Sequence, residues 1–145
     1  MEINPEVEEK VKKFLDIERK HMGTHLGIEF LKFSRDEVIA SMPVDERTHQ
    51  PFGILHGGAS VTLAETVASV GAWLNIETEK KAAVGLEINA NHIRPVRSGR
   101  VIGTATPIHR GSQTQLWQII IRNEQEKKVC VSRCTMAVIK KPGAS

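Results

Sequence analysis

The chain has 145 residues, 40% of them hydrophobic and 26% charged, which is ordinary for one soluble globular domain. We therefore expect residues 1–145 to form a single domain. No apolar run approaches the ~18 residues that a membrane-spanning helix needs, and the acidic first ten residues do not resemble a secretory signal peptide. These observations favour a cytoplasmic protein without a membrane partner.

Charge is distributed unevenly along the sequence. Residues 1–90 contain 10 Lys and Arg against 15 Asp and Glu, a balance of −5, whereas residues 91–145 contain 10 against 2, a balance of +8. A basic half favours an anionic partner, although a solvated basic face gives the same pattern. Nucleic acid is disfavoured because the chain has no Tyr and only 4% aromatic residues, so it lacks the basic, aromatic strand that stacks bases.

The two cysteines, Cys130 and Cys134, do not predict a disulfide. On one strand, residues four apart would lie roughly 13 Å from each other at ~3.3 Å per residue, which is too far for a bridge. One pair with this spacing is also a poor zinc site. We expect reduced thiols.

The first half of the sequence predicts two helices separated by two strands. An amphipathic helix is expected over residues 5–21, because Val11, Phe14 and Leu15 follow helical spacing, with Met22 and Gly23 ending it. Two short strands and a loop follow, over residues 28–33, 38–44 and 45–55. The next helix, residues 56–75, is apolar on almost all sides and must therefore be enclosed by other elements.

The second half predicts four strands joined by short polar turns, over residues 82–93, 100–109, 113–123 and 129–139. Short turns indicate antiparallel neighbours rather than crossover connections. The predicted fold class is α+β: one antiparallel sheet of about six strands, curled around the long helix, with the N-terminal helix outside.

The predicted central helix carries a narrow polar stripe. At 100° per residue, four polar side chains fall within about 100° of arc: Thr62, Glu65, Thr66 and Ser69. Because burying a lone carboxylate is costly, Glu65 indicates a cleft in which it acts as general base or nucleophile. The alternative is that this face meets solvent or a subunit interface.

Two consecutive glycines, Gly57 and Gly58, begin the same helix. The N–H groups of a first helical turn are unpaired and lie at the positive end of the helix dipole, so they suit an oxyanion. Glu65 lies about 12 Å further along the axis at 1.5 Å per residue. One helix therefore cannot easily bring both groups to one carbonyl, whereas two antiparallel helices from two subunits could. The spacing argues for a dimer with shared sites.

The motif HGGASVTLAETVAS (residues 56–69), with upstream Gln50 and downstream NHIRPVRSG (residues 91–99), resembles the hotdog-fold acyl-CoA thioesterases. The most similar branch carries a glutamate on the central helix and includes 4-hydroxybenzoyl-CoA, 1,4-dihydroxy-2-naphthoyl-CoA and enterobactin-proofreading thioesterases. The resemblance covers residues 27–139, to which residues 1–22 add the N-terminal helix. It implies a homodimer with shared active sites and, from two such dimers, a homotetramer.

The resemblance also implies roles for individual residues. Glu65 matches the catalytic carboxylate, and Gly57 matches the residue whose N–H polarises the thioester carbonyl. Other positions match residues that orient substrate or water near the thioester: Gln50, His56, Ser69 and His92. A structural side chain is an equally good interpretation of His92. The other histidines have no partner pattern, and no metal or redox cofactor is required.

Coenzyme A carries a pyrophosphate and a 3′-phosphate, so the resemblance implies a basic rim on the binding site. The basic half supplies candidates at predicted strand ends and turns: Arg94, Arg97, Ser98, Gly99, Arg110, Gly111 and Ser112. For any single arginine, a solvated turn residue is the alternative.

The predicted function is hydrolysis of an acyl-CoA thioester to free acid and CoA. The polar stripe favours an aromatic acyl group, whereas Phe52, Trp73 and Leu74 would equally bound a medium-chain aliphatic one. A non-catalytic acyl-CoA-binding protein is a further alternative. The paired aspartate and histidine of a hydratase or dehydratase of this fold are not found in the sequence.

Overall fold

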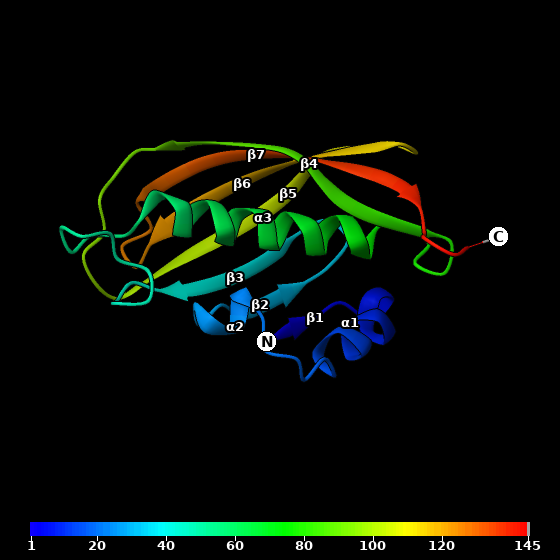
Figure 1. The fold of residues 1–145 in the computed structure, drawn as a ribbon, viewed down its shortest axis with the longest axis horizontal. Coiled ribbons are helices and arrows are strands. Elements are labelled where there is room, and N and C mark those ends of the chain that lie inside the picture. Colours follow the sequence, from blue (N-terminus) through cyan, green and yellow to red (C-terminus); the bar gives the residue numbers. More distant parts are fainter. Residues whose placement is uncertain (145) are drawn as a thin grey trace.

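The computed structural model describes residues 1–144, which form one sheet wrapped around a long helix. The elements in chain order are β1 (Glu2–Ile3), the 3-10 turn η1 (Pro5–Val7), α1 (Glu8–Leu15), α2 (Met22–His25), β2 (Glu29–Phe33), β3 (Val38–Pro43), α3 (Gly57–Leu74), β4 (Lys81–His92), β5 (Arg100–Arg110), β6 (Thr114–Asn123) and β7 (Lys128–Lys140). Figure 1 shows the sheet arching over α3, with α1 and α2 on the opposite side. The predicted α+β class and its curled sheet are confirmed.

The sheet has the strand order β1-β2-β3-β5-β6-β7-β4. β2 to β7 all pair antiparallel with their neighbours. The short turns correctly predict that β5 pairs with β6 and β6 with β7, but the prediction that β4 and β5 are neighbours is wrong: β4 pairs with β7 at the edge of the sheet, and β5 lies between β3 and β6. The seventh strand, β1, was not predicted, and it pairs parallel with β2 through Glu2 and Ile3. Two residues are too few to show a strand period, so only tertiary pairing reveals this strand.

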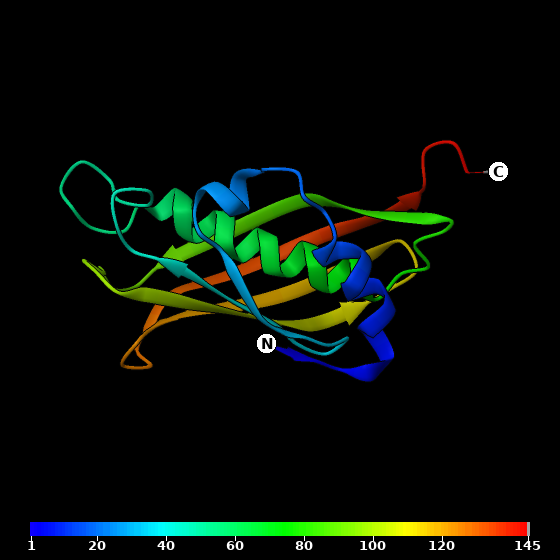
Figure 2. The same cartoon turned by 90° about the horizontal axis from the view of Figure 1, so that it is seen from below.

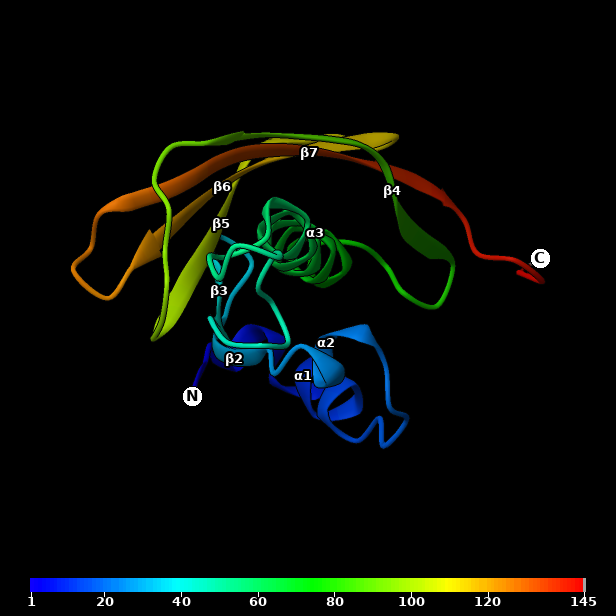
Figure 3. The same cartoon turned by 60° about the vertical axis from the view of Figure 1, so that its left-hand side comes forward.

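Helix α3 is the centre of the core, as its apolar sequence predicts. Leu63, Ala64, Val67 and Ala68 are fully buried against the concave face of the sheet, which curves around them in Figure 3. Small residues allow close approach: a Cβ at Gly71 would lie 2.7 Å from Cη2 of Trp117, whose side chain is fully buried. The large indole of β6 therefore fits against the helix only because position 71 has no side chain.

The predicted N-terminal helix over residues 5–21 is wrong in its extent. The α-helix ends at Leu15, and Met22 and Gly23 begin the short α2 instead of ending a long helix. Val7 and Val11 are buried and Phe14 packs on the core, but residues 16–20 are mostly charged and offer no apolar face to continue the helix. Packing of an apolar face, rather than propensity, decides where such a helix stops.

The N-terminal elements cover the side of α3 that the sheet leaves open. Seen from below in Figure 2, α2 lies toward the amino-terminal half of α3 and α1 toward its carboxyl end. There the Lys10 ammonium donates to the backbone oxygens of Leu74 (3.2 Å) and Ile76 (2.6 Å). These bonds satisfy carbonyls that a helix end leaves without intrahelical partners, and they fix α1 against α3.

Candidate active site

Glu65 lies on a cleft of about 480 Å³ between α3 and the N-terminal elements. The polar stripe of α3 forms one wall, and Phe14, Ile28 and Phe30 form the opposite one. The hydroxyls of Thr62 and Thr66 donate back to the helix carbonyls of Gly58 (2.9 Å) and Thr62 (2.7 Å). Within residues 1–144 the Glu65 carboxylate forms no hydrogen bond or ion pair, so its oxygens are available to a ligand or water in the cleft.

Glycine at position 85 makes room for that carboxylate. A Cβ there would overlap Oε1 of Glu65, and the pairing of β4 with β7 shifts register between Gly85 and Glu87. Buried Cys134 of β7 lies nearby: burial raises the pKa of its thiol to about 12, and the carboxylates of Glu65 and Glu87 add to the shift. Ser69 also lines the cleft, with its hydroxyl 3.9 Å from Sδ of Met136.

A second cleft, of about 350 Å³, lies at the amino end of α3 and is lined by Gln50, Gly57, His92 and Arg94. The sequence analysis predicted all four of these residues for the site. A Cβ at Gly57 would lie 2.8 Å from Nε2 of His92, so the imidazole lies directly against the first residue of the helix. Gln50 accepts the Phe52 N–H with Oε1, which leaves its amide NH₂ free to face a ligand.

The first turn of α3 has one free N–H pointing out of the helix. His56 is the N-cap: its Nδ1 accepts the Gly58 N–H at 2.8 Å, and its carbonyl accepts those of Ala59 and Ser60. In the described residues 1–144, no acceptor takes the Gly57 N–H. His56 thus has a structural role, and the available hydrogen-bond donor is the backbone of Gly57, beside His92.

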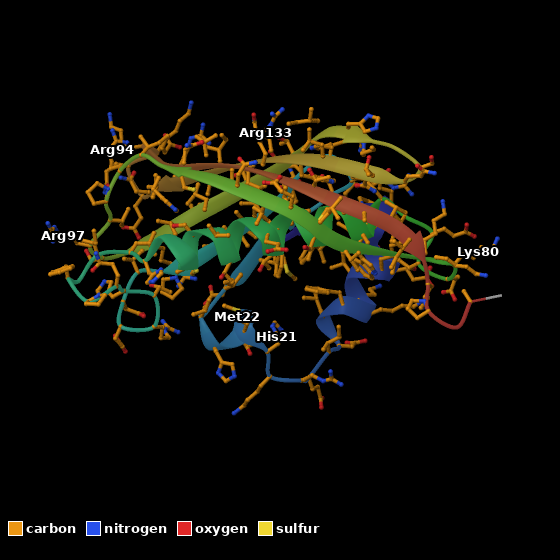
Figure 4. All side chains as sticks on the ribbon, turned by 45° about the horizontal axis from the view of Figure 1, so that its top comes forward. His21, Met22, Lys80, Arg94, Arg97 and Arg133 are labelled. Atoms are coloured by element: carbon orange, nitrogen blue, oxygen red, sulfur yellow. The ribbon has the colours of Figure 1, made fainter. Side chains whose placement is uncertain are left out.

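The residues predicted for the basic rim lie in two separate places in the structure. Arg94 lines the cleft at Gly57, while Arg97 and Ser98 line a neighbouring polar pocket of about 230 Å³. Figure 4 shows Arg94 and Arg97 at the same end of the molecule, the amino end of α3. Gly99 lies in the adjoining turn with φ +79°, against the Glu124 carboxylate.

The other three rim candidates lie at the opposite end of β5, about 33 Å away at 3.3 Å per residue. Arg110 is already engaged there: its Nη1 donates to Asp36 (2.8 Å), to the Arg35 carbonyl (3.1 Å) and to Asn75 (3.3 Å). Gly111 and Ser112 form the adjacent turn. Within one subunit, the seven predicted rim residues therefore fall into two separate groups. Sequence order could not show that a long straight strand separates the two groups.

Several cleft residues were missed at the sequence level. His21, one of the histidines without a partner pattern in the sequence, lines the Glu65 cleft together with Met22, and both lie beneath α3 in Figure 4. Leu74, considered for the acyl pocket, is fully buried in the core instead. The sequence could have indicated Gly85, because a glycine inside a strand is typical of a bulge or of a close approach by another group.

A curled sheet wrapped around one long central helix defines the hotdog class, and comparisons with known proteins give the family. The thioesterase superfamily model matches residues 52–130. The 1,4-dihydroxy-2-naphthoyl-CoA hydrolase of Escherichia coli K12 is 51% identical over 126 residues, covering 87% of this chain and 84% of that protein. The proofreading thioesterase EntH of Klebsiella pneumoniae is 48% identical over 118 residues, covering 81% and 85%.

A solved structure supports the same family and fold. The crystal structure of a thioesterase from Haemophilus influenzae superposes with a TM-score of 0.81 at 52% identity, covering 91% of this chain and 90% of that one. The chain belongs to the thioesterase superfamily and is an enzyme of that family with the hotdog fold. Within residues 1–144, no helix is both long and apolar enough to cross a membrane.

Proposed function

We propose that this protein hydrolyses aromatic acyl-CoA thioesters to the free acid and CoA. The Gly57 N–H donates to the thioester oxygen and stabilises the negative charge that develops as the carbonyl becomes tetrahedral. The Glu65 carboxylate either removes a proton from the attacking water or attacks the carbonyl itself. The carbon–sulfur bond then breaks, and the CoA thiolate leaves and takes up a proton. If Glu65 has attacked the carbonyl, water then hydrolyses the mixed anhydride, which releases the free acid and restores the carboxylate.

The observation that carries this proposal is that the two proposed catalytic groups lie in two separate half-sites on α3. The Gly57 N–H without an acceptor and the Glu65 carboxylate without a partner are separated by eight residues, or about 12 Å of helix. Neither cleft contains both groups. We propose that two subunits place their α3 helices antiparallel, so that Glu65 of one meets Gly57 of the other.

The edge of the sheet supplies a surface for that dimer. β4 pairs on one side with β7, and it is the outermost strand on its other side. Val84 and Leu86 on this strand are 43% and 66% exposed, and Phe52 in the loop before α3 is 87% exposed. A long apolar edge strand is a template for pairing with a second chain. Joining two β4 edges would extend the sheet and cover these side chains.

Aromatic substrates are favoured by the wall of the Glu65 cleft. The ring of Phe14 meets that of Phe30 edge to face, with centroids 5.3 Å apart and an interplanar angle of 88°. The aromatic faces that these rings turn toward the cleft suit an aryl group, which packs on them edge to face or offset. The E. coli relative, a hydrolase of 1,4-dihydroxy-2-naphthoyl-CoA, is consistent with such a substrate. We propose that the CoA phosphates bind to Arg97 and to Arg94, whose Nη1 also donates to the Lys128 carbonyl at 2.8 Å.

The experiment is thiol release from a panel of CoA esters by the wild-type protein and by Glu65→Gln. We expect benzoyl- and naphthoyl-CoA to be hydrolysed, and Glu65→Gln to lower kcat by about 10²-fold or more, as loss of a general base typically does. An unchanged melting temperature would show that the fold is intact. Wild-type turnover in folded Glu65→Gln would exclude the role of Glu65, and binding of CoA esters without thiol release would identify a non-catalytic binding protein.

A further inference from the structure

Three cavities meet on the side of α3 that faces α1, and the ring of Phe14 takes part in the walls of all three. The first is the cleft of about 480 Å³ that contains Glu65. The second is a groove of about 310 Å³ between α1 and α3, lined mainly by Ile17, Val70 and Trp73. The third, of about 410 Å³, extends past Leu15 toward the amino terminus. No other residue lines all three of these cavities.

Phe14 is held firmly in this position. Besides its edge-to-face contact with Phe30, its ring lies 6.0 Å from the rings of both Phe33 and Trp73. The helix that carries it is fixed to the core by buried Val11 and by the Lys10 ammonium, which donates to the carbonyls at the end of α3. A ring with contacts on three sides acts as a wall rather than as a mobile side chain.

We infer that Phe14 sets the upper length of the acyl group that the enzyme accepts, an inference that rests on the proposed function. An acyl chain whose carbonyl lies at Glu65 extends along α3 past Ser69 and Val70, the residues shared by the cleft and the groove, and then meets Phe14. An aryl group fits in front of this ring, and a long aliphatic chain does not. A small side chain at position 14 would join the cleft to the apolar groove.

The groove has the chemistry to hold such a chain. Its walls are the apolar side chains of Ile17, Val70 and Trp73 together with the stem of Lys13, whose ammonium reaches solvent. Each additional methylene transferred from water into an apolar site improves binding by about fourfold. A variant with an open path should therefore gain affinity for each methylene that passes position 14, whereas the wild-type protein should not.

The test measures kcat/KM for benzoyl-, hexanoyl-, decanoyl- and tetradecanoyl-CoA with the wild-type protein, Phe14→Leu and Phe14→Ala. We expect wild-type values to fall from hexanoyl to tetradecanoyl. Phe14→Ala should raise the tetradecanoyl-to-benzoyl ratio at least about tenfold, which corresponds to burying two or more methylenes. Phe14→Leu, which keeps a branched apolar side chain and disturbs folding least, should give a smaller gain of the same sign.

Two controls make the result specific. Leu15→Ala truncates the apolar side chain at the next position of α1, away from the Glu65 cleft, and should leave the ratio unchanged. Adding Ile17→Trp to Phe14→Ala should refill the groove and abolish the gain. An unchanged ratio in both Phe14 variants, or an equal gain in Leu15→Ala, would overturn the inference. If the wild-type protein releases thiol from none of the esters, the proposed function itself fails.

Discussion

The carboxylate of Glu65 lies against the backbone of Gly85, so closely that a Cβ at position 85 would overlap Oε1. The two residues come from α3 and β4, and the register shift in β4 begins at this glycine. The strand therefore determines where the carboxylate can point. Real Cβ atoms do not approach this closely, so any other residue at position 85 must displace Glu65.

We predict that Gly85→Ala lowers kcat at least about tenfold with little change in KM. If Glu65 is the base, its displaced carboxylate stabilises the transition state less well, and the lost free energy exceeds that of one hydrogen bond. In Gly85→Ala, the shorter carboxylate of Glu65→Asp should restore part of the activity, although Glu65→Asp alone impairs the enzyme. Steady-state kinetics of the four proteins measure this coupling. Asn89→Ala, elsewhere on β4 with a side chain bonded only to Glu87, is the control. Additive losses would mean that Gly85 does not position Glu65.

The proposed shared sites predict complementation between two inactive variants. Glu65→Gln and Gly57→Val each damage one half-site, so each homodimer should be inactive. In a heterodimer, one of the two sites combines an intact Glu65 with an intact Gly57. Random mixing after refolding should therefore restore about a quarter of wild-type activity, because half of the dimers are mixed and each contains one working site. No recovery after verified subunit exchange would place both groups of one site in a single subunit.

The contact between Gly71 and Trp117 predicts a loss of stability that is independent of catalysis. The Cβ of Gly71→Ala would lie 2.7–3.1 Å from three ring atoms of a fully buried indole, whose N–H donates to Gln115 at 2.9 Å. Overpacking of this kind costs about 1–3 kcal/mol. Urea denaturation should show this loss. Adding Trp117→Phe should make the alanine less costly than it is in the wild-type background, and equal costs in the two backgrounds would contradict the contact.

Asp45 predicts a pH dependence in the loop before the active site. Its carboxylate accepts hydrogen bonds from three N–H groups of Arg47, the Nε and Nη2 of the side chain and the backbone N, which lower its pKa to about 2. A carboxyl pKa below its ordinary value of about 3.9 contributes stability above that pH, and the contribution is lost as the pH falls toward 2. NMR titration should give a midpoint near 2 in the wild-type protein and a higher one in Arg47→Gln, still below about 3.9 because the backbone N–H of residue 47 continues to donate to Oδ1. Equal midpoints would show that the pair does not form in solution.

The sequence alone determined the architecture of this protein. Alternating strands with short turns, together with a helix that is apolar on almost every side, are compatible with few folds other than a sheet curled around that helix. The local pattern also identified Glu65 and Gly57, because a lone carboxylate on a core helix and a glycine pair at a helix start are unusual on physical grounds. Both signals lie within one element, where the helical period fixes relative positions.

Only the tertiary structure decided which residues from different elements meet. The separation of Arg94 from Arg110 follows from the length of β5, and the contact of Gly85 with Glu65 follows from a bulge that strand periodicity does not record. The position of Phe14 depends on where α1 stops, which packing against β2 and α3 decides rather than propensity. Contacts between distant segments depend on register and packing, and the sequence pattern of any one segment does not contain them.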